Sequence, residues 1–386
     1  MINVNSPFQK YNGYSGLSNK SNPLDTIPIE SIIYSNFIRY DKLRELTLNQ
    51  FSNSNANQLN IYIDMYTMIK SIYDRNLIHE GSLFASMILN LAAHMRSYYW
   101  TRHQVSTNIY IIMTSNSNTV SPEPAMVPEW GESIKFITDP KRSEILKWNI
   151  QLLKLLVPYF TRLHFIYGSV ESSIMINNLI RQNNNGYPNI ILSKDLMTWQ
   201  IPSLDFNSCV FRPHKSKNED LSFCVNQQNV FEMWRHTVNH SKTQSSVVLP
   251  PEMLSLYIAL TSFKNRGLNS YYSSRTVPSM LWKLVEDRKI SLGYNSPEAI
   301  SKVLRSLEMK KDYLKEFESY TNNLLYRYNM VDLNRLTMIY SNSPEANDKS
   351  WDYHKIDPDS IKEINDKYFI NNPIDIIKLY DNPPEA

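Results

Sequence analysis

The segments GSVESSIMINNLI (residues 168–180) and NIILSKDLMTW (residues 189–199) decide how this sequence is interpreted. The first begins with glycine, carries a carboxylate at Glu171 and continues as a mainly apolar stretch typical of a helix. The second is a short apolar run that ends close to Asp195, as in a buried strand that delivers an acid at its carboxyl end. Loop, helix and strand together predict half of an acidic metal site at the edge of an α/β sheet.

Further strand and helix patterns surround these two segments. Strand patterns cover residues 59–64, 107–113 and 163–168, and amphipathic helix patterns cover residues 82–100 and 143–159. This order predicts right-handed parallel connections, with helices on both faces of the sheet. The expected fold is a mainly parallel α/β sheet over residues 59–205, with Asp64, Glu171 and Asp195 at one edge. Asp64 also stands where a helix pattern begins, so a simple helix cap is the alternative for that residue.

Four regions of the chain differ in composition. Residues 1–58 are polar and interrupted by prolines, which predicts an N-terminal arm and linker. Residues 59–245 form the predicted α/β domain, and residues 246–341 carry the apolar stripes of a helical subdomain. Residues 342–386 are predicted to be an acidic C-terminal tail.

The composition limits the class of protein. Of 386 residues, 42% are hydrophobic and only eight are glycine, so a folded core is expected and glycine-loop phosphate binding is not. Cys209 and Cys224 are too few for a disulfide framework and lack zinc-site spacing, which favours reduced thiols in an intracellular, cytoplasmic setting. Residues 1–14 lack the apolar core of a signal peptide, and His94 interrupts the apolar segment 83–100, so no membrane association is expected.

Charge is unevenly distributed around a net value of +3. Residues 262–289 contain six basic and two acidic residues, whereas residues 347–386 contain nine acidic residues and five lysines. The first segment is the candidate phosphate-binding surface, and the alternative is an ordinary solvated helix face. The candidate nucleic-acid-binding residues are Lys264, Arg266, Arg275 and Lys283.

The acid-bearing segments resemble the 5′–3′ exonuclease and flap endonuclease family of PIN-like nucleases. In that family the loop reads approximately G-x-E-A-D-D and the strand end reads S-x-D-x-D. The acids that this sequence keeps are Asp64, Glu171 and Asp195. The positions at which other residues replace acids of the family are Ser173, Ile174 and Ser193. The resemblance therefore implies a PIN-like fold with a degenerate acid cluster.

A second part of the resemblance lies in the predicted helical subdomain. In the family, a helix-three-turn-helix with a glycine-rich turn binds duplex DNA through a potassium ion held by the backbone. This sequence offers helix patterns at residues 249–264 and 276–285, but residues 269–276 replace the glycine-rich turn. The resemblance implies a helix pair whose DNA-binding turn is degenerate.

The family hydrolyses phosphodiesters with two divalent cations, which require a dense cluster of carboxylates. The three remaining acids imply one Mg²⁺ ion at most. The predicted function is therefore a catalytically impaired homologue that serves as a structural or nucleic-acid-associated protein, and any remaining activity would be that of a Mg²⁺-dependent 5′–3′ exonuclease or flap endonuclease. The resemblance implies DNA as a candidate partner, together with replication or virion proteins. The composition, rich in Asn and Tyr, is similar to that of phage proteins.

Two other functions stay open at this stage. Asp64, Glu171 and Asp195 would be the catalytic and metal-binding residues of an active 5′ nuclease, and an interaction module without nucleic-acid binding is the third hypothesis. The sequence contains no Walker loop, H-E-x-x-H or G-x-S-x-G motif. His236 and His240 have helical i, i+4 spacing, but no acid or cysteine accompanies them at ligand spacing, which argues against a metal site.

Overall fold

The structure is a computed structural model that describes a large part of the chain. The described residues are 58–65, 83–114, 149–168, 170–183, 186–193, 195–211, 224–241, 245, 247–263, 268–291, 295–309, 323–341, 359, 361–363, 366 and 379.

Six strands form one sheet with the order β3-β2-β1-β4-β5-β6. The strands are β1 (Gln58–Asp64), β2 (Ser106–Thr114), β3 (Leu163–Gly168), β4 (Asn189–Leu192), β5 (Ser208–Phe211) and β6 (Cys224–Val225). The first five are mutually parallel, and β6 pairs antiparallel to β5. This arrangement confirms the predicted mainly parallel α/β sheet, whose apolar strands are buried on both faces.

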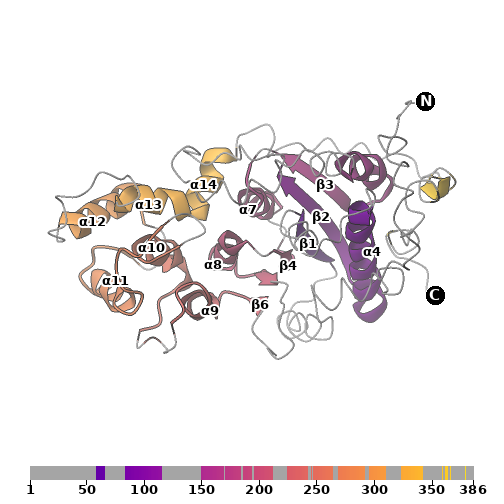
Figure 1. The fold of residues 1–386 in the computed structure, drawn as a ribbon. Coiled ribbons are helices and arrows are strands. Elements are labelled where there is room, and N and C mark those ends of the chain that lie inside the picture. Colours follow the sequence, from indigo (N-terminus) through magenta and orange to yellow (C-terminus); the bar gives the residue numbers. More distant parts are fainter. Residues whose placement is uncertain are drawn as a thin grey trace, which may run out of the picture.

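Helices cover the sheet and continue beyond it (Figure 1). The α-helices are α4 (Leu83–His103), α7 (Ser172–Gln182), α8 (Ile201–Leu204), α9 (Val230–Thr237), α10 (Leu254–Leu260), α11 (Val277–Glu286), α12 (Pro297–Met309), α13 (Leu324–Val331) and α14 (Leu333–Tyr340). Three short 3-10 helices are η3 (Val157–Tyr159), η4 (Leu196–Gln200) and η5 (Pro251–Met253), and residues 149–156 are also helical. None of the described helices combines the length and apolar character that a bilayer crossing requires.

Side chains of the strands alternate between two apolar cores. Tyr62 and Ile112 join a cluster with α7 that continues into α10–α14, whereas Ile61 and Ile111 pack in a second cluster with α4. The helices α7 and α4 accordingly lie on opposite sides of the sheet (Figure 1). Burial of each large apolar side chain contributes roughly 1.5–3 kcal/mol. Asp64 follows Tyr62 by two residues and therefore belongs to the α7 face of β1.

Aromatic rings stack across three strands on the α7 face. The ring centroids of Tyr62 and Tyr110 are 4.9 Å apart, and those of Tyr110 and His164 are 4.6 Å apart. The strand register pairs these residues directly. Burial, together with the positive charge of Arg96, lowers the pKa of His164 to about 4. The ring is therefore neutral at ordinary pH.

Two apolar residues near the C-terminus pack against the α4 side of the sheet. Ile361 and Leu379 are buried in the same cluster as the apolar residues of α4. Arg96 of α4, only 1% exposed, donates hydrogen bonds to the backbone carbonyls of Leu379 and Thr107. Parts of the region predicted to be an acidic tail thus complete the core around α4.

Candidate functional site

Asp64 ends β1 at the carboxyl edge of the sheet and is only 1% exposed. The parallel register of β1 and β4 pairs Ile63 with Leu192, so the next residue of each strand lies alongside the other. The Ser193 hydroxyl donates a hydrogen bond of 2.6 Å to the Asp64 Oδ2 atom. A buried carboxylate loses its hydration and needs such donors. Ser193 is therefore the neutral partner of a buried acid.

Asp195 lies at the same edge of the sheet as Asp64 and follows Ser193 by two residues. Its backbone N–H donates to the Ser193 hydroxyl over 3.0 Å, so one hydroxyl links the two acidic positions. The Asp195 Oδ1 atom accepts a 3.0 Å hydrogen bond from the backbone N–H of Met197 and caps η4. Half-buried Asp195 thus has a structural task, of a kind that contributes about 1 kcal/mol.

Glu171 stands at the N-cap position of α7, where its side chain makes no capping hydrogen bond. Its strand, β3, is separated from β1 by β2. Burial and, to a smaller extent, the charge of Glu171 raise the pKa of Tyr340 at the end of α14. A 2.8 Å hydrogen bond from Asn177 of α7 to Thr337 of α14 joins these two helices. Glu171 therefore lies beside α14.

Within the described ranges, no three His, Cys, Asp or Glu side chains gather as a group that could hold a metal ion. Two positions that carry acids in the resembling family have other tasks here. Ile174 is 2% exposed and packs in the core on the α7 face, and the Ser193 hydroxyl supplies a hydrogen bond instead of negative charge. The donors that the described residues place at this edge are fewer than two divalent cations require.

The turn between α10 and α11 is built around Arg327 of α13, a residue that no sequence pattern singled out. Its guanidinium donates to the backbone carbonyls of Ala259 and Asn269, each over 2.7 Å, and to that of Thr261. The side chain is 1% exposed, and burial lowers its pKa to about 10. Three carbonyl oxygens of this turn therefore already face a positive charge that the chain itself supplies. The only sequence signal was an arginine within the otherwise mostly apolar and aromatic stretch LLYRYNMV.

The candidate nucleic-acid-binding residues fall into two groups. Arg275, before α11, and Lys283, within it, are exposed, so both side chains can reach a ligand. Lys264 and Arg266 lie outside the described residues. A phosphate-binding role for these four residues stays a prediction.

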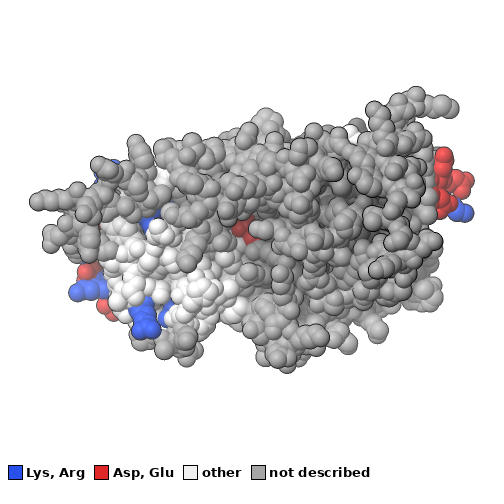
Figure 2. All heavy atoms as spheres, in the orientation of Figure 1, with Lys and Arg blue, Asp and Glu red and all other residues white. Residues whose placement is uncertain are grey.

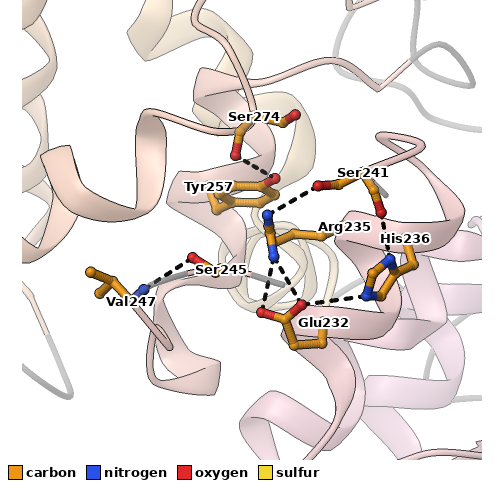
Figure 3. A network of polar contacts seen from close by, with 8 residues as sticks. All are labelled: Glu232, Arg235, His236, Ser241, Ser245, Val247, Tyr257 and Ser274. Carbon is orange, nitrogen blue, oxygen red and sulfur yellow. Dashed lines mark hydrogen bonds and ion pairs between the residues drawn. The ribbon is translucent and has the colours of Figure 1, made fainter. Parts of the chain in front are cut away.

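His236 belongs to a structural network around α9 (Figure 3). Arg235 donates to both carboxylate oxygens of Glu232, at 3.1 and 2.9 Å, and to the Ser241 hydroxyl at 3.0 Å. The His236 Nε2 atom lies 3.6 Å from Glu232, and its Nδ1 atom contacts the carbonyl of Ser241. Glu232 stands four residues before His236, so the expectation that no acid accompanies this histidine at helical spacing was wrong. The helix ends at Thr237, and His240 has a φ of 50°, so the two histidines do not share one helix face.

No protein-family model matches the sequence, and no curated protein matches it. Three solved structures that resemble this fold are of proteins from bacteriophage T5. The T5 D15 protein co-crystallised with metal ions has a TM-score of 0.46 and 12% identity, over 75% of this chain and 95% of that chain. A T5 flap endonuclease variant in a pseudo-enzyme–product complex with DNA and metal ions has a TM-score of 0.47 and 12% identity, over 75% and 94%.

A third structure, the T5 5′-exonuclease with bound zinc, has a TM-score of 0.45 and 12% identity, over 73% of this chain and 91% of that chain. The second and third of these structures carry names of the family that the sequence resembles. TM-scores below 0.5 are too low to transfer activity, ligands or residue roles to this chain.

Proposed function

We propose that this protein has a nuclease-like fold, binds nucleic acid and does not hydrolyse it. The observation that carries this proposal is the 2.6 Å hydrogen bond from the Ser193 hydroxyl to the buried Asp64 carboxylate. In the resembling family an acid stands at the position of Ser193. Here the hydroxyl donates to one carboxylate oxygen, Oδ2, from within the fold, so that oxygen has a partner other than a cation.

Electrostatics supports the loss of two-metal chemistry. Two divalent cations about 4 Å apart repel each other by roughly 17 kcal/mol at an effective dielectric constant of about 20. Only nearby carboxylates can offset a repulsion of that size. Asp64 and Asp195 lie at neighbouring strand ends, whereas Glu171 follows a strand two places away. Among the described residues, too little negative charge is concentrated at this edge for a pair of ions.

An active nuclease with one metal ion is the rival function, and one observation favours it. Asp64 and Asp195 are linked through Ser193, and two carboxylates are a common ligand set for Mg²⁺. Their hydrogen bonds compete with an ion at two of the four carboxylate oxygens, because the Ser193 hydroxyl donates to Asp64 Oδ2 and the Met197 N–H donates to Asp195 Oδ1. We therefore assign no catalytic step to this edge.

DNA is the proposed ligand, because exposed lysine and arginine side chains lie in the helical part of the chain. Arg275 and Lys283 are proposed phosphate contacts, together with Lys264 and Arg266. Sequence-independent contacts of this kind suit a protein that covers or positions a strand without cutting it. Proteins of a replication complex or a virus particle are the proposed further partners.

Labelled flap and single-stranded DNA test this proposal directly. The wild-type protein is expected to bind without divalent cations and to release no product with Mg²⁺ or Mn²⁺. The matched variant carries Asp195→Asn together with Glu171→Gln. Cleavage by the wild type that disappears in this variant, with the fold retained in its circular dichroism spectrum, would establish the rival nuclease function.

A further inference from the structure

An open groove of about 680 Å³ lies between α12 and α14. Among the described lining residues, the cations are Lys302 and Arg305 of α12 and Arg335 of α14, and the one acid is Glu298. None of the three cations forms a salt bridge with another described residue. On the face drawn in Figure 2, the Lys and Arg side chains of the described residues lie mainly at the end of the molecule that includes α11 and α12.

Helix geometry directs these cations outward. The apolar stripe of α12, which includes Ile300, Leu304 and Leu307, is buried in the core on the α7 face. Lys302 and Arg305 lie on the other side of the helix and are exposed. Spaced three residues apart, they are neighbours on that surface. The core therefore holds two cations of α12 in a fixed relation without covering either one.

Helix α14, which forms the other side of the groove, is also held in place by buried contacts. Leu333 and Leu336 of α14 are buried, and the 2.8 Å hydrogen bond between Asn177 and Thr337 ties α14 to α7. Half-buried Arg335 lies between these anchors and reaches the groove. A basic groove whose walls are packed before a ligand arrives has little conformational entropy left to lose on binding.

The chemistry of the lining selects an anion. Guanidinium groups bind phosphate oxygens through paired hydrogen bonds, and a lysine adds a compact positive charge. The exposed Ser306 hydroxyl is a further donor, whereas the Ser301 hydroxyl already donates to the Pro297 carbonyl over 2.7 Å. The open shape suits a chain of phosphates that crosses the surface more than a small enclosed ligand.

We infer that this groove binds successive phosphodiester groups of a nucleic-acid strand. The inference rests on the proposed nucleic-acid binding and assigns it a surface separate from Arg275 and Lys283. Contacts through phosphate make this binding independent of base sequence and sensitive to salt.

The test measures affinity for a labelled oligothymidylate as a function of salt concentration. The groove variant carries Lys302→Gln, Arg305→Gln and Arg335→Gln. Removing three cations that neutralise phosphates of a single strand reduces the slope of log K against log salt by about 2, so affinity at about 0.1 M salt falls on the order of 100-fold. The matched control carries Lys154→Gln, Lys289→Gln and Lys362→Gln, which change net charge equally and lie outside the groove lining.

A charge-retaining variant, Arg305→Lys with Arg335→Lys, is expected to keep the wild-type slope. An unchanged slope and affinity in the groove variant, with the wild type still binding, would overturn the groove and leave the proposed function intact. A loss in the control equal to that in the groove variant would also overturn the groove proposal.

Two further outcomes concern the proposed function. A wild type that cuts DNA, but whose binding depends on the groove cations, would refute the proposed lack of hydrolysis and keep the groove. Absence of binding by the wild type at low salt would overturn both.

Discussion

The carboxyl edge of the sheet and the α10–α11 turn each hold a buried charge, with opposite sign. At the sheet edge, the Asp64 carboxylate accepts a hydrogen bond from the Ser193 hydroxyl. In the turn, the Arg327 guanidinium donates to three backbone carbonyls. The resembling family uses bound cations in both places. In this chain the Ser193 hydroxyl donates to the Asp64 Oδ2 atom and Arg327 donates to three carbonyls, so the fold itself supplies a partner in each region.

The two regions differ in how many polar groups would lose a hydrogen bond if Arg327 or Ser193 were replaced. Arg327 is the common partner of three carbonyls, whereas Ser193 joins a single carboxylate to one N–H group. An unsatisfied buried group costs about 1–3 kcal/mol, so the turn should be the more sensitive of the two regions. Single substitutions of Arg327 and Ser193 test which region loses more stability.

Arg327→Met is expected to cause the largest loss. The substitution keeps an apolar stem and leaves the carbonyls of Ala259, Thr261 and Asn269 without their donor. We expect the free energy of unfolding in denaturant to fall by about 3–5 kcal/mol. Exposed Arg275→Met is the control and should stay within about 0.5 kcal/mol of the wild type. A loss below about 1 kcal/mol for Arg327→Met would show that the turn does not depend on this cation.

His164 extends the comparison to a buried group that the fold keeps neutral. Its pKa in the folded protein is about 4, against 6.5 for the ordinary side chain, so the unfolded chain binds a proton first as the pH falls. The contribution of His164 to stability is complete above pH 6.5 and declines down to about pH 4, by about 3 kcal/mol in total. His164→Phe keeps the stack on Tyr110 and should remove this part of the pH dependence. Identical pH profiles of wild type and variant, measured by denaturant unfolding, would contradict the neutral buried ring.

Ser193→Ala should cost less than Arg327→Met, about 1–3 kcal/mol, because it removes one donor from buried Asp64. A double-mutant cycle with Asp64→Asn separates this hydrogen bond from general effects of the substitutions. Exposed Ser306→Ala is the matched control and is expected to be neutral. A coupling energy near zero between the residues of the cycle would mean that Ser193 does not stabilise Asp64.

Asp195 should show the smallest effect. Asp195→Ala removes the cap of η4 and is expected to cost about 1 kcal/mol, while Asp195→Asn keeps a capping oxygen and should cost little. Thermal unfolding at neutral pH can resolve the difference between the two variants. Equal losses would assign the effect to the negative charge of Asp195 instead of its capping bond.

Local patterns predicted much of the fold, because each one depends on neighbouring residues. The apolar runs at residues 59–64 and 189–192 became β1 and β4, and the acid near the end of each run indicated the sheet edge at which Asp64 and Asp195 lie. The partner of Asp64 could not be predicted in this way. Ser193 is 129 residues away, and only the register between β1 and β4 brings the two together.

Arg327 shows the same limit for the turn. Its acceptors lie 58 to 68 residues earlier, and the packing of α13 against α10 places the guanidinium among them. A single arginine in a helical stretch carries no local sign of that position. The groove between α12 and α14 likewise depends on how two helices are packed, not on the composition of either one.

Cation-dependent stability of the wild type and Asp64→Asn tests most directly whether the sheet edge holds the ions that hydrolysis needs. Thermal unfolding is measured without divalent cations and with about 10 mM Mg²⁺, a concentration at which a site with a Kd of about 1 mM adds roughly 1.4 kcal/mol of stability. We predict no Mg²⁺-dependent stabilisation in either protein. Stabilisation of that size in the wild type that is lost in Asp64→Asn would contradict a sheet edge satisfied by its own hydroxyl.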